Sequence, residues 1–223
     1  AGVPFASGSD TEVLLRAWAA WGPDSVRRLE GMYAFAVLDR DAQSLTLCRD
    51  PFGIKPLFYR VVPGEGIAFG SEVASILPLL PSRPRLDWAT AVSYLSAGAY
   101  DDSTATFIDG VRQLAPGRSI VVDLAAGEVR ADLPSLWRPS IGTDESITAG
   151  QAVEAVRTLL LESVHRNLRA AVPVRIALSG GIDSVVLLHA AAAARQTAAA
   201  PWSLSAHHVH HGLSPNADAW TKH

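Results

Sequence analysis

The first 133 residues alternate short runs of apolar side chains with turn-forming residues, a pattern typical of antiparallel sheets. The runs MYAFAVLD and SLTLCRD flank a polar turn and predict one hairpin. Three hairpins are expected in all, from residues 32–39 with 44–50, 56–62 with 66–71, and 118–124 with 129–133. This part of the chain is therefore predicted to be strand-rich and antiparallel, with helices attached.

Helix signals appear near the start of the chain and again before the third hairpin. The segment Ser-Asp-Thr-Glu fits a capping box, with Ser9 as the N-cap and Glu12 reaching back to it. Apolar residues then recur at helical spacing as far as a Gly-Pro pair at 22–23, which should end the helix. A further helix is predicted over about 87–96.

The pattern changes after residues 134–150, a stretch rich in Pro, Ser, Gly and Thr that we interpret as a linker. A helix, an apolar strand, a glycine loop, a second helix and a second strand follow, over about 152–170, 172–178, 179–184, 184–195 and 203–209. A strand, a loop, a helix and another strand in this order predict a parallel, doubly wound sheet. We expect two domains of different architecture, residues 1–140 and 150–223.

Composition narrows the class of protein. Hydrophobic residues make up 48% of the chain and charged residues 18%, which excludes a disordered chain. The net charge of −3 lacks the basic footprint of a nucleic-acid binder. Cys48 is the single cysteine, so an internal disulfide and a cysteine-rich metal site are excluded and a cytoplasmic location is expected. No apolar stretch approaches the ~18 residues of a membrane span, so we expect no membrane partner.

The loop between the apolar strand and the second helix of this region carries the densest chemistry. The first turn of a helix leaves unpaired N–H groups, and the positive end of the helix dipole lies there too, so the position favours an anion. Glycines let the backbone approach an anion closely, and serine hydroxyls supply donors. An ordinary glycine turn is the structural alternative. The residues expected to bind phosphate are Leu178, Ser179, Gly180, Gly181, Asp183 and Ser184.

The pattern Ser-Gly-Gly-x-Asp-Ser in this loop resembles the pyrophosphate loop of the ATP pyrophosphatases. The loop has no lysine in the Walker A position and does not fit G-x-G-x-x-G. Members of that family cleave ATP between its α and β phosphates and adenylate a substrate. The resemblance therefore implies ATP as the cofactor, with Asp183 as a partner of Mg²⁺, either directly or through water.

Residues 1–184 resemble the asparagine synthetase family, whose glutaminase domain is a class II glutamine amidotransferase with an N-terminal-nucleophile fold. The matching segments, in family order, are SGSDTEVLL, LEGMYAFAVLD, CRDPFGIKPLFY, FGSEVASIL, YLSAGAYDDSTATFIDGVRQLAPG and LWRP. Asp10 matches the aspartate that holds the α-amino group of glutamine, a role compatible with its place in the helix cap. The implied fold class is an α+β antiparallel sandwich of the N-terminal-nucleophile type, truncated, followed by the start of an α/β parallel-sheet ATP-pyrophosphatase domain.

The nucleophile of that family has no counterpart here. In the family it is a cysteine at the mature N-terminus, whereas residue 1 is Ala1, and the Asn-Gly-Glu segment that completes the glutamine site is also absent. Cys48 lies in an apolar strand, where a small buried core residue is expected. We therefore identify no catalytic residue and expect a truncated or hybrid amidotransferase without glutaminase activity.

The stretch 176–220 is similar to the tRNA(Ile)-lysidine synthetase family, because SGGIDSVVLLHA is followed by LSAHHVHHGLSPNADAW. Four histidines gather there: His207, His208, His210 and His211. On a strand with alternating faces at most two of the imidazoles share one side, which disfavours a metal site. A position at the carboxyl edge of a parallel sheet favours ligand binding instead, with His208 and His211 lining the ATP or acceptor pocket.

Both resemblances imply one chemistry, in which ATP activates a carbonyl oxygen, pyrophosphate leaves and a nitrogen nucleophile displaces AMP. We expect an asparagine synthetase-like ligase that adenylates aspartate and uses ammonia from glutamine. A lysidine synthetase-like enzyme and a non-catalytic nucleotide-binding fragment are the alternatives. The expected partners are small-molecule substrates, with tRNA and lysine only under the first alternative. Any self-association is expected to give a homodimer.

Overall fold

The computed structural model describes residues 4–99, 102–133, 140–168, 173–197, 202–210 and 218–219. The chain divides into two compact units, Ala1–Ser140 and Ile141–His223. Each unit buries a hydrophobic cluster of its own.

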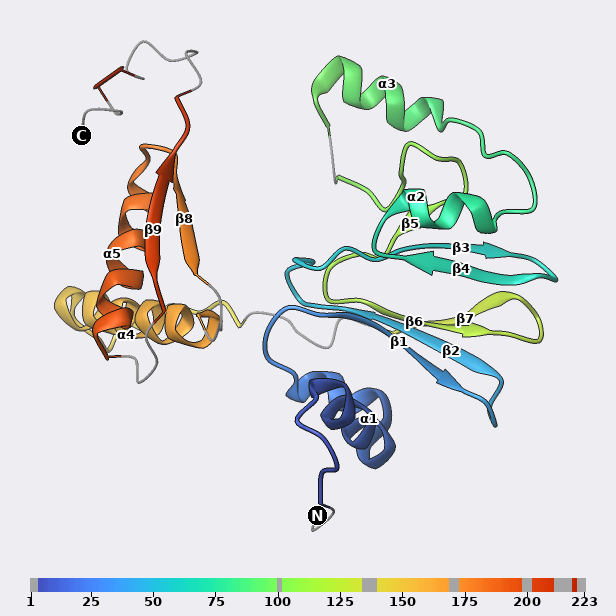
Figure 1. The fold of residues 1–223 in the computed structure, drawn as a ribbon, viewed down its shortest axis with the longest axis horizontal. Coiled ribbons are helices and arrows are strands. Elements are labelled where there is room, and N and C mark those ends of the chain that lie inside the picture. The colour runs from blue at the N-terminus through green and yellow to red at the C-terminus, as the bar shows by residue number, and fades with distance from the viewer. Residues whose placement is uncertain are drawn as a thin grey trace. The chain divides into compact units, whose positions relative to one another are not determined.

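Two antiparallel sheets form the first unit (Figure 1). One has the strand order β1-β2-β6-β7, made of Ala34–Asp39, Ser44–Arg49, Ser119–Asp123 and Glu128–Leu133. The other has the order β4-β3-β5, made of Gly66–Gly70, Phe58–Val62 and Arg112–Gln113. The three predicted hairpins are confirmed. The strand β5 lies outside the prediction, because two residues are too few to show a periodicity.

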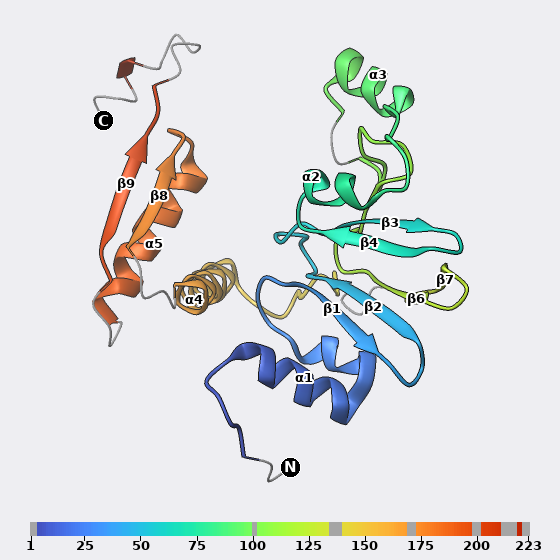
Figure 2. The same cartoon turned by 45° about the vertical axis from the view of Figure 1, so that its right-hand side comes forward.

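The main core of this unit lies between the two sheets (Figures 1 and 2). Alternate residues of β2 and β6 point into it, and Tyr59 of β3 and Ile67 of β4 pack against them from the other sheet. Its buried members are Leu45, Leu47, Leu57, Leu114, Ile120 and Val122. The alternation along the strands thus supplies one apolar face per sheet, and the two faces cover each other.

Helices cover the outer faces of both sheets. Helix α1 (Asp10–Trp21) lies on the four-stranded sheet, where the ring of Trp18 meets Phe35 edge-on with centroids 6.1 Å apart. Helix α2 (Val73–Ile76) lies on the three-stranded sheet, and its Ile76 is fully buried. A 3₁₀ turn over Leu77–Leu79 and helix α3 (Trp88–Ala97) follow. The unit is therefore layered as helix, sheet, sheet and helix.

The start of α1 differs in detail from the predicted capping box. Ser9 is the N-cap, as predicted, and its hydroxyl accepts a hydrogen bond from the Thr11 N–H. The Glu12 carboxylate reaches past the cap to the N–H groups of Ala6 and Ser7. The predicted end of the α-helix at the Gly-Pro pair is confirmed, because α1 ends at Trp21 with Gly22 as its C-cap. A separate 3₁₀ helix follows over Gly22–Arg28, with the proline in its first turn, where no N–H is needed.

The second unit contains a parallel pair of strands and two helices, in the predicted order. Strand β8 (Val174–Leu178) pairs with β9 (Leu204–His208), and α5 (Ile182–Thr197) connects them through the glycine loop. Helix α4 (Ala149–Asn167) begins three residues before the predicted start, because Thr148 and Gln151 form a capping box. The buried cluster is Val164, Ile176, Ala190, Ala191, Ala194 and Trp202. None of the helices in the described part of the chain is long and apolar enough to cross a membrane.

The core between the sheets predicts a contrast between two leucines on neighbouring strands. Leu47 of β2 is fully buried, whereas Leu38 of β1 is 51% exposed. Leu47→Ala should lower the free energy of unfolding by about 2–5 kcal/mol, because the removed methyl groups leave a cavity. The matched variant Leu38→Ala should lower it by less than about 1 kcal/mol. Urea unfolding measures both, and equal losses would contradict the assignment of this core.

Candidate functional sites

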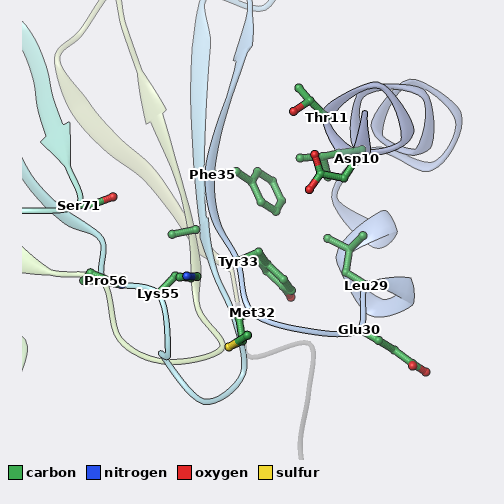
Figure 3. A pocket seen from close by; sticks show the side chains of 12 residues that line it. Asp10, Thr11, Leu29, Glu30, Met32, Tyr33, Phe35, Lys55, Pro56 and Ser71 are labelled. Atoms are coloured by element: carbon green, nitrogen blue, oxygen red, sulfur yellow. The ribbon is translucent and has the colours of Figure 1, made fainter. Parts of the chain in front are cut away.

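A cavity of about 670 Å³ opens beside α1 in the first unit. Figure 3 shows Asp10 on its helical wall and Lys55 and Pro56 on the facing wall, with the rings of Tyr33 and Phe35 between them. A carboxylate and an ammonium group thus border the same space, next to aromatic surface. This combination suits a small molecule that carries charges of both signs and a short side chain.

The helical wall is set by hydrogen bonds around the beginning of α1. Asp10 is the first helical residue, and its side chain is exposed. The Glu12 carboxylate accepts hydrogen bonds from the Ala6 N–H at 2.9 Å and from the Ser7 N–H at 2.7 Å, and it pairs with Arg16 at 2.7 Å. The segment before the helix is therefore folded back onto its first turn. The sequence pointed to Asp10, and the structure places it on the cavity wall.

The facing wall depends on Asp50, whose side chain is fully buried. Its carboxylate accepts hydrogen bonds from the N–H groups of Phe52, Ile54 and Lys55, at 3.1, 3.0 and 2.9 Å. Burial by itself raises the pKa of Asp50, but these hydrogen bonds outweigh it and hold the pKa below its ordinary value. The carboxylate therefore stays charged and fixes the backbone that carries Lys55.

The neighbouring Arg49 completes this wall from the other side of the backbone. Its guanidinium donates to the carbonyl oxygens of Lys55, Gly53 and Leu114, at 2.8, 2.7 and 2.6 Å. Gly53 has a φ of +63°, and a Cβ there would lie 2.8 Å from a side-chain carbon of Pro116. Both backbone groups of Lys55 are thus held by buried charged side chains. In the sequence, the segment CRDPFGIKP was notable only for its resemblance to the asparagine synthetase family. The hydrogen bonds of Arg49 and Asp50 could not be predicted, because long-range contacts leave no periodic signal.

The floor of the cavity is neutral. Burial raises the pKa of Tyr33 to about 12, with further contributions from Cys48 and Asp50. Cys48 itself is fully buried in β2, and burial raises the pKa of its thiol to about 11 although a hydrogen bond with Ser119 lowers it. The expectation of a buried core cysteine is confirmed. A thiol with this pKa and no exposed surface is not available as a nucleophile at neutral pH.

In the second unit, the glycine loop joins the carboxyl end of β8 to the first turn of α5. The Ser179 N–H and Oγ both donate to the Ser184 Oγ at 3.3 Å, and the Ser184 hydroxyl donates to the Gly181 carbonyl at 2.9 Å. Gly180 has a φ of +85°, which only glycine adopts readily. Asp183 lies in the first helical turn and is exposed. Hydroxyls, backbone N–H groups and a helix N-terminus thus meet at one edge of the sheet.

His208 links the second strand to this loop. It ends β9, and its Nδ1 donates to the Leu178 carbonyl at 2.8 Å. Its Nε2 is buried and has no hydrogen-bond partner among the described residues. The two other described histidines of the 207–211 cluster have separate partners: His207 contacts Ser205, and His210 lies 2.9 Å from Asp218.

The histidines do not form a metal site in the described part of the chain. Across those residues no group of three or more His, Cys, Asp and Glu side chains is placed to hold a metal ion. His208 bonds to the Leu178 carbonyl next to the loop, and its place in a ligand pocket stays a prediction, while His207 and His210 have separate partners. His211, the other residue predicted to line the pocket, lies outside the described residues.

The buried carboxylate of Asp50 makes a specific prediction. Asp50→Asn leaves one acceptor oxygen and turns an NH₂ group toward N–H donors, so it should lower the free energy of unfolding at pH 7 by about 2–4 kcal/mol. Because the folded pKa of Asp50 is depressed, its contribution to stability is present above about 3.8, the ordinary value, and is lost as the pH falls. The variant should therefore lose less stability on acidification than the wild type.

Denaturant unfolding between pH 3 and 7 measures both effects. Asp41→Asn, in the exposed turn between β1 and β2, is the matched control and should change neither. An Asp50→Asn protein as stable as the wild type would show that the loop does not depend on this carboxylate.

Comparison with known proteins places both units in families. The family model of the glutamine amidotransferase domain matches residues 1–132, and that of the PP-loop domain matches residues 153–223. Asparagine synthetase [glutamine-hydrolyzing] 2 of Bacillus subtilis is 34% identical over 198 residues, which cover 84% of this chain and 26% of that protein. Asparagine synthetase [glutamine-hydrolyzing] 3 of the same organism is 32% identical over 86% of this chain and 30% of that protein.

A fungal protein matches the same region. Amidase chyE of Penicillium rubens is 32% identical over 182 residues, which cover 81% of this chain and 26% of that protein. The chain thus spans between 26% and 30% of the length of these three relatives. With the first family model covering more than half of its residues, and as the sequence motifs predicted, the chain belongs to the glutamine amidotransferase domain family and carries a PP-loop domain after it.

Proposed function

We propose that this chain supplies the glutamine-binding and ATP-binding parts of an asparagine synthetase-like amidotransferase. In that reaction an aspartate side-chain carboxylate attacks the α-phosphorus of ATP, pyrophosphate leaves, and ammonia derived from glutamine displaces AMP. The observation that carries the proposal is the presence, in one chain, of a cavity with Asp10 on its wall and a Ser-Gly-Gly-x-Asp-Ser loop between β8 and α5. The named activity of the Bacillus subtilis relatives supports the choice of substrates.

On the glutamine side, the Asp10 carboxylate would pair with the α-amino group of the bound amino acid. The cavity that Asp10 borders has the volume and the mixed charge to admit a free amino acid. The one thiol of this chain, Cys48, is buried, with a pKa raised to about 11. We therefore infer that the 223 residues bind glutamine without hydrolysing it. The layering of helix, sheet, sheet and helix is compatible with an N-terminal-nucleophile fold.

On the ATP side, the loop would cradle the pyrophosphate. The N-terminus of α5 and the backbone N–H groups at Gly180 and Gly181 offer donors and a positive dipole end to a polyanion. The hydroxyls of Ser179 and Ser184 lie at the same edge. Asp183, exposed in the first turn, would hold Mg²⁺ together with the phosphates and water, a donor set that suits an ion usually bound by one or two carboxylates. That ion would offset the charge on the leaving pyrophosphate.

Two substitutions in the loop test this binding mode. A Cβ at Gly181 would meet only the Ser179 hydroxyl, at 3.4 Å, so Gly181→Val should fold. Its side chain would nevertheless keep phosphate oxygens away from the backbone, and ATP–Mg²⁺ affinity should fall by about ten- to a hundred-fold for each charge-assisted hydrogen bond lost. Asp183→Asn should weaken binding mainly when Mg²⁺ is present.

Calorimetric titration measures these affinities, and circular dichroism reports folding. Gly142→Val is the matched control, since a Cβ at that glycine has open space around it and lies far from the loop in sequence. Unchanged ATP affinity in folded Gly181→Val would reduce the glycine pair to an ordinary turn.

The second candidate is a tRNA(Ile)-lysidine synthetase-like activity. It is favoured by the hydrogen bond between His208 and Leu178 at the end of β8, because both residues lie in the stretch that resembles that family. Exchange of labelled pyrophosphate into ATP separates the candidates. We expect exchange that depends on aspartate, because adenylation of the acceptor is reversible. Exchange that requires tRNA would instead establish the second candidate, and ATP binding without exchange for either acceptor would identify the chain as a non-catalytic nucleotide-binding unit.

A further inference from the structure

The carboxylate of Glu12 gathers more short hydrogen bonds than helix capping requires. It accepts two from the Ala6 N–H, at 2.9 and 3.1 Å, and two from Ser7, through the backbone N–H and the hydroxyl, both at 2.7 Å. Arg16, one turn later on α1, holds the same carboxylate at 2.7 Å. The N-cap of the helix is a different residue, Ser9, so these contacts act on the segment that precedes the helix.

The hydrogen bonds continue from Glu12 to both neighbours of Asp10. The Ser7 hydroxyl, which donates to Glu12, accepts from the Ser9 N–H at 3.3 Å. The Ser9 hydroxyl in turn accepts from the Thr11 N–H at 3.2 Å. Asp10 therefore sits between two residues whose backbones are tied into one network. Asp10 and Thr11 line the cavity, whereas Glu12 is not among the described residues that line it.

We propose that Glu12 is a positioning residue, which aims the Asp10 carboxylate at the α-amino group of the amino acid in the cavity. This inference rests on the proposed glutamine site. A carboxylate on an exposed first turn has several rotamers and a backbone that can fray, and each alternative lowers the population that is ready to bind. By fixing the backbone on both sides of Asp10, Glu12 removes part of that cost before the ligand arrives.

The charge state of Glu12 suits this role. Hydrogen bonds from Ala6, Ser7 and Arg16 lower its pKa to about 2, against a slight opposing effect of burial. The Glu12 carboxylate is therefore ionised at neutral pH. Loss of the charge in Glu12→Gln keeps the size of the side chain but leaves one acceptor oxygen in place of two.

A double-mutant cycle on the 223-residue chain tests the proposal, with L-glutamine binding followed by NMR titration. Glu12→Gln should raise the Kd about tenfold, and Asp10→Asn should raise it at least as much. In Asp10→Asn, adding Glu12→Gln should change the Kd by less than about twofold, because a residue that acts through Asp10 has no further effect once Asp10 is altered. For 4-carbamoylbutanoate, which is glutamine without its α-amino group, Glu12→Gln should leave the Kd unchanged.

Two further variants separate positioning from folding. Glu65→Gln, in the exposed turn between β3 and β4, is the matched control and should bind glutamine like the wild type. Ser7→Ala removes the relay hydroxyl but leaves the Arg16 pair intact, so it should weaken binding in the same direction, and it serves if Glu12→Gln does not fold.

The outcomes distinguish the inference from the function on which it rests. An unchanged Kd in Asp10→Asn would overturn the proposed glutamine site itself. A weakened Asp10→Asn with either an unaffected Glu12→Gln or a fully additive double variant would overturn only the positioning role. Equal weakening of glutamine and 4-carbamoylbutanoate by Glu12→Gln would also overturn it, since the effect would then not pass through the α-amino group.

Discussion

One buried carboxylate, that of Asp50, ties together the parts of the first unit that surround the cavity. The Asp50 side chain accepts hydrogen bonds from three N–H groups of the loop after β2. The Asp50 backbone N–H donates to the Tyr33 carbonyl, and the Asp50 carbonyl accepts from the Gly117 N–H. A buried charge is costly unless its hydrogen-bonding capacity is filled, and here backbone N–H groups of the loop fill it. The same contacts fix the loop that carries Lys55.

In both candidate sites, backbone N–H groups converge on an acceptor that belongs to the protein, but the strength of the hydrogen bonds differs. Around Glu12 and Asp50, backbone N–H groups converge on an anion that belongs to the protein, through bonds mostly between 2.7 and 3.1 Å. In the glycine loop they converge on serine hydroxyls, through bonds of 3.3 Å, at the weak end of the normal range. Phosphate oxygens are stronger acceptors than hydroxyls, so a bound polyphosphate could replace these internal bonds at small cost. The contacts of Glu12 and Asp50 therefore fix the walls of the cavity. The weaker contacts in the glycine loop would allow its N–H groups to bond to a phosphate instead of a serine hydroxyl.

Local sequence patterns predicted most helices and strands, whereas the side-chain contacts that they missed depend on the tertiary structure. Alternating apolar runs predicted the three hairpins, and the Ser9 cap and the glycine loop were visible because their signals lie within a few residues. The reach of Glu12 to Ala6 was not, since the capping rule describes contacts with the N-cap alone. The hydrogen bonds of Arg49 could not be predicted either, because one of its three acceptors, the Leu114 carbonyl, is 65 residues away in the chain. Asp10 was found through a resemblance, and its cavity only through the fold.

The position of Cys48 in the sheet explains why its thiol is not available as a nucleophile. Along β2, Leu45 and Leu47 point into the core between the sheets, so Cys48, one residue on, faces the opposite side, paired with Phe35 of β1 and Ser119 of β6. Cys48 is fully buried there, and this burial favours the neutral thiol and raises its pKa to about 11. In the proposed function, the Asp10 carboxylate would pair with an ammonium group without help from a thiol. Under that proposal the cavity would select an amino acid by charge, although Cys48, the one cysteine of the chain, is buried.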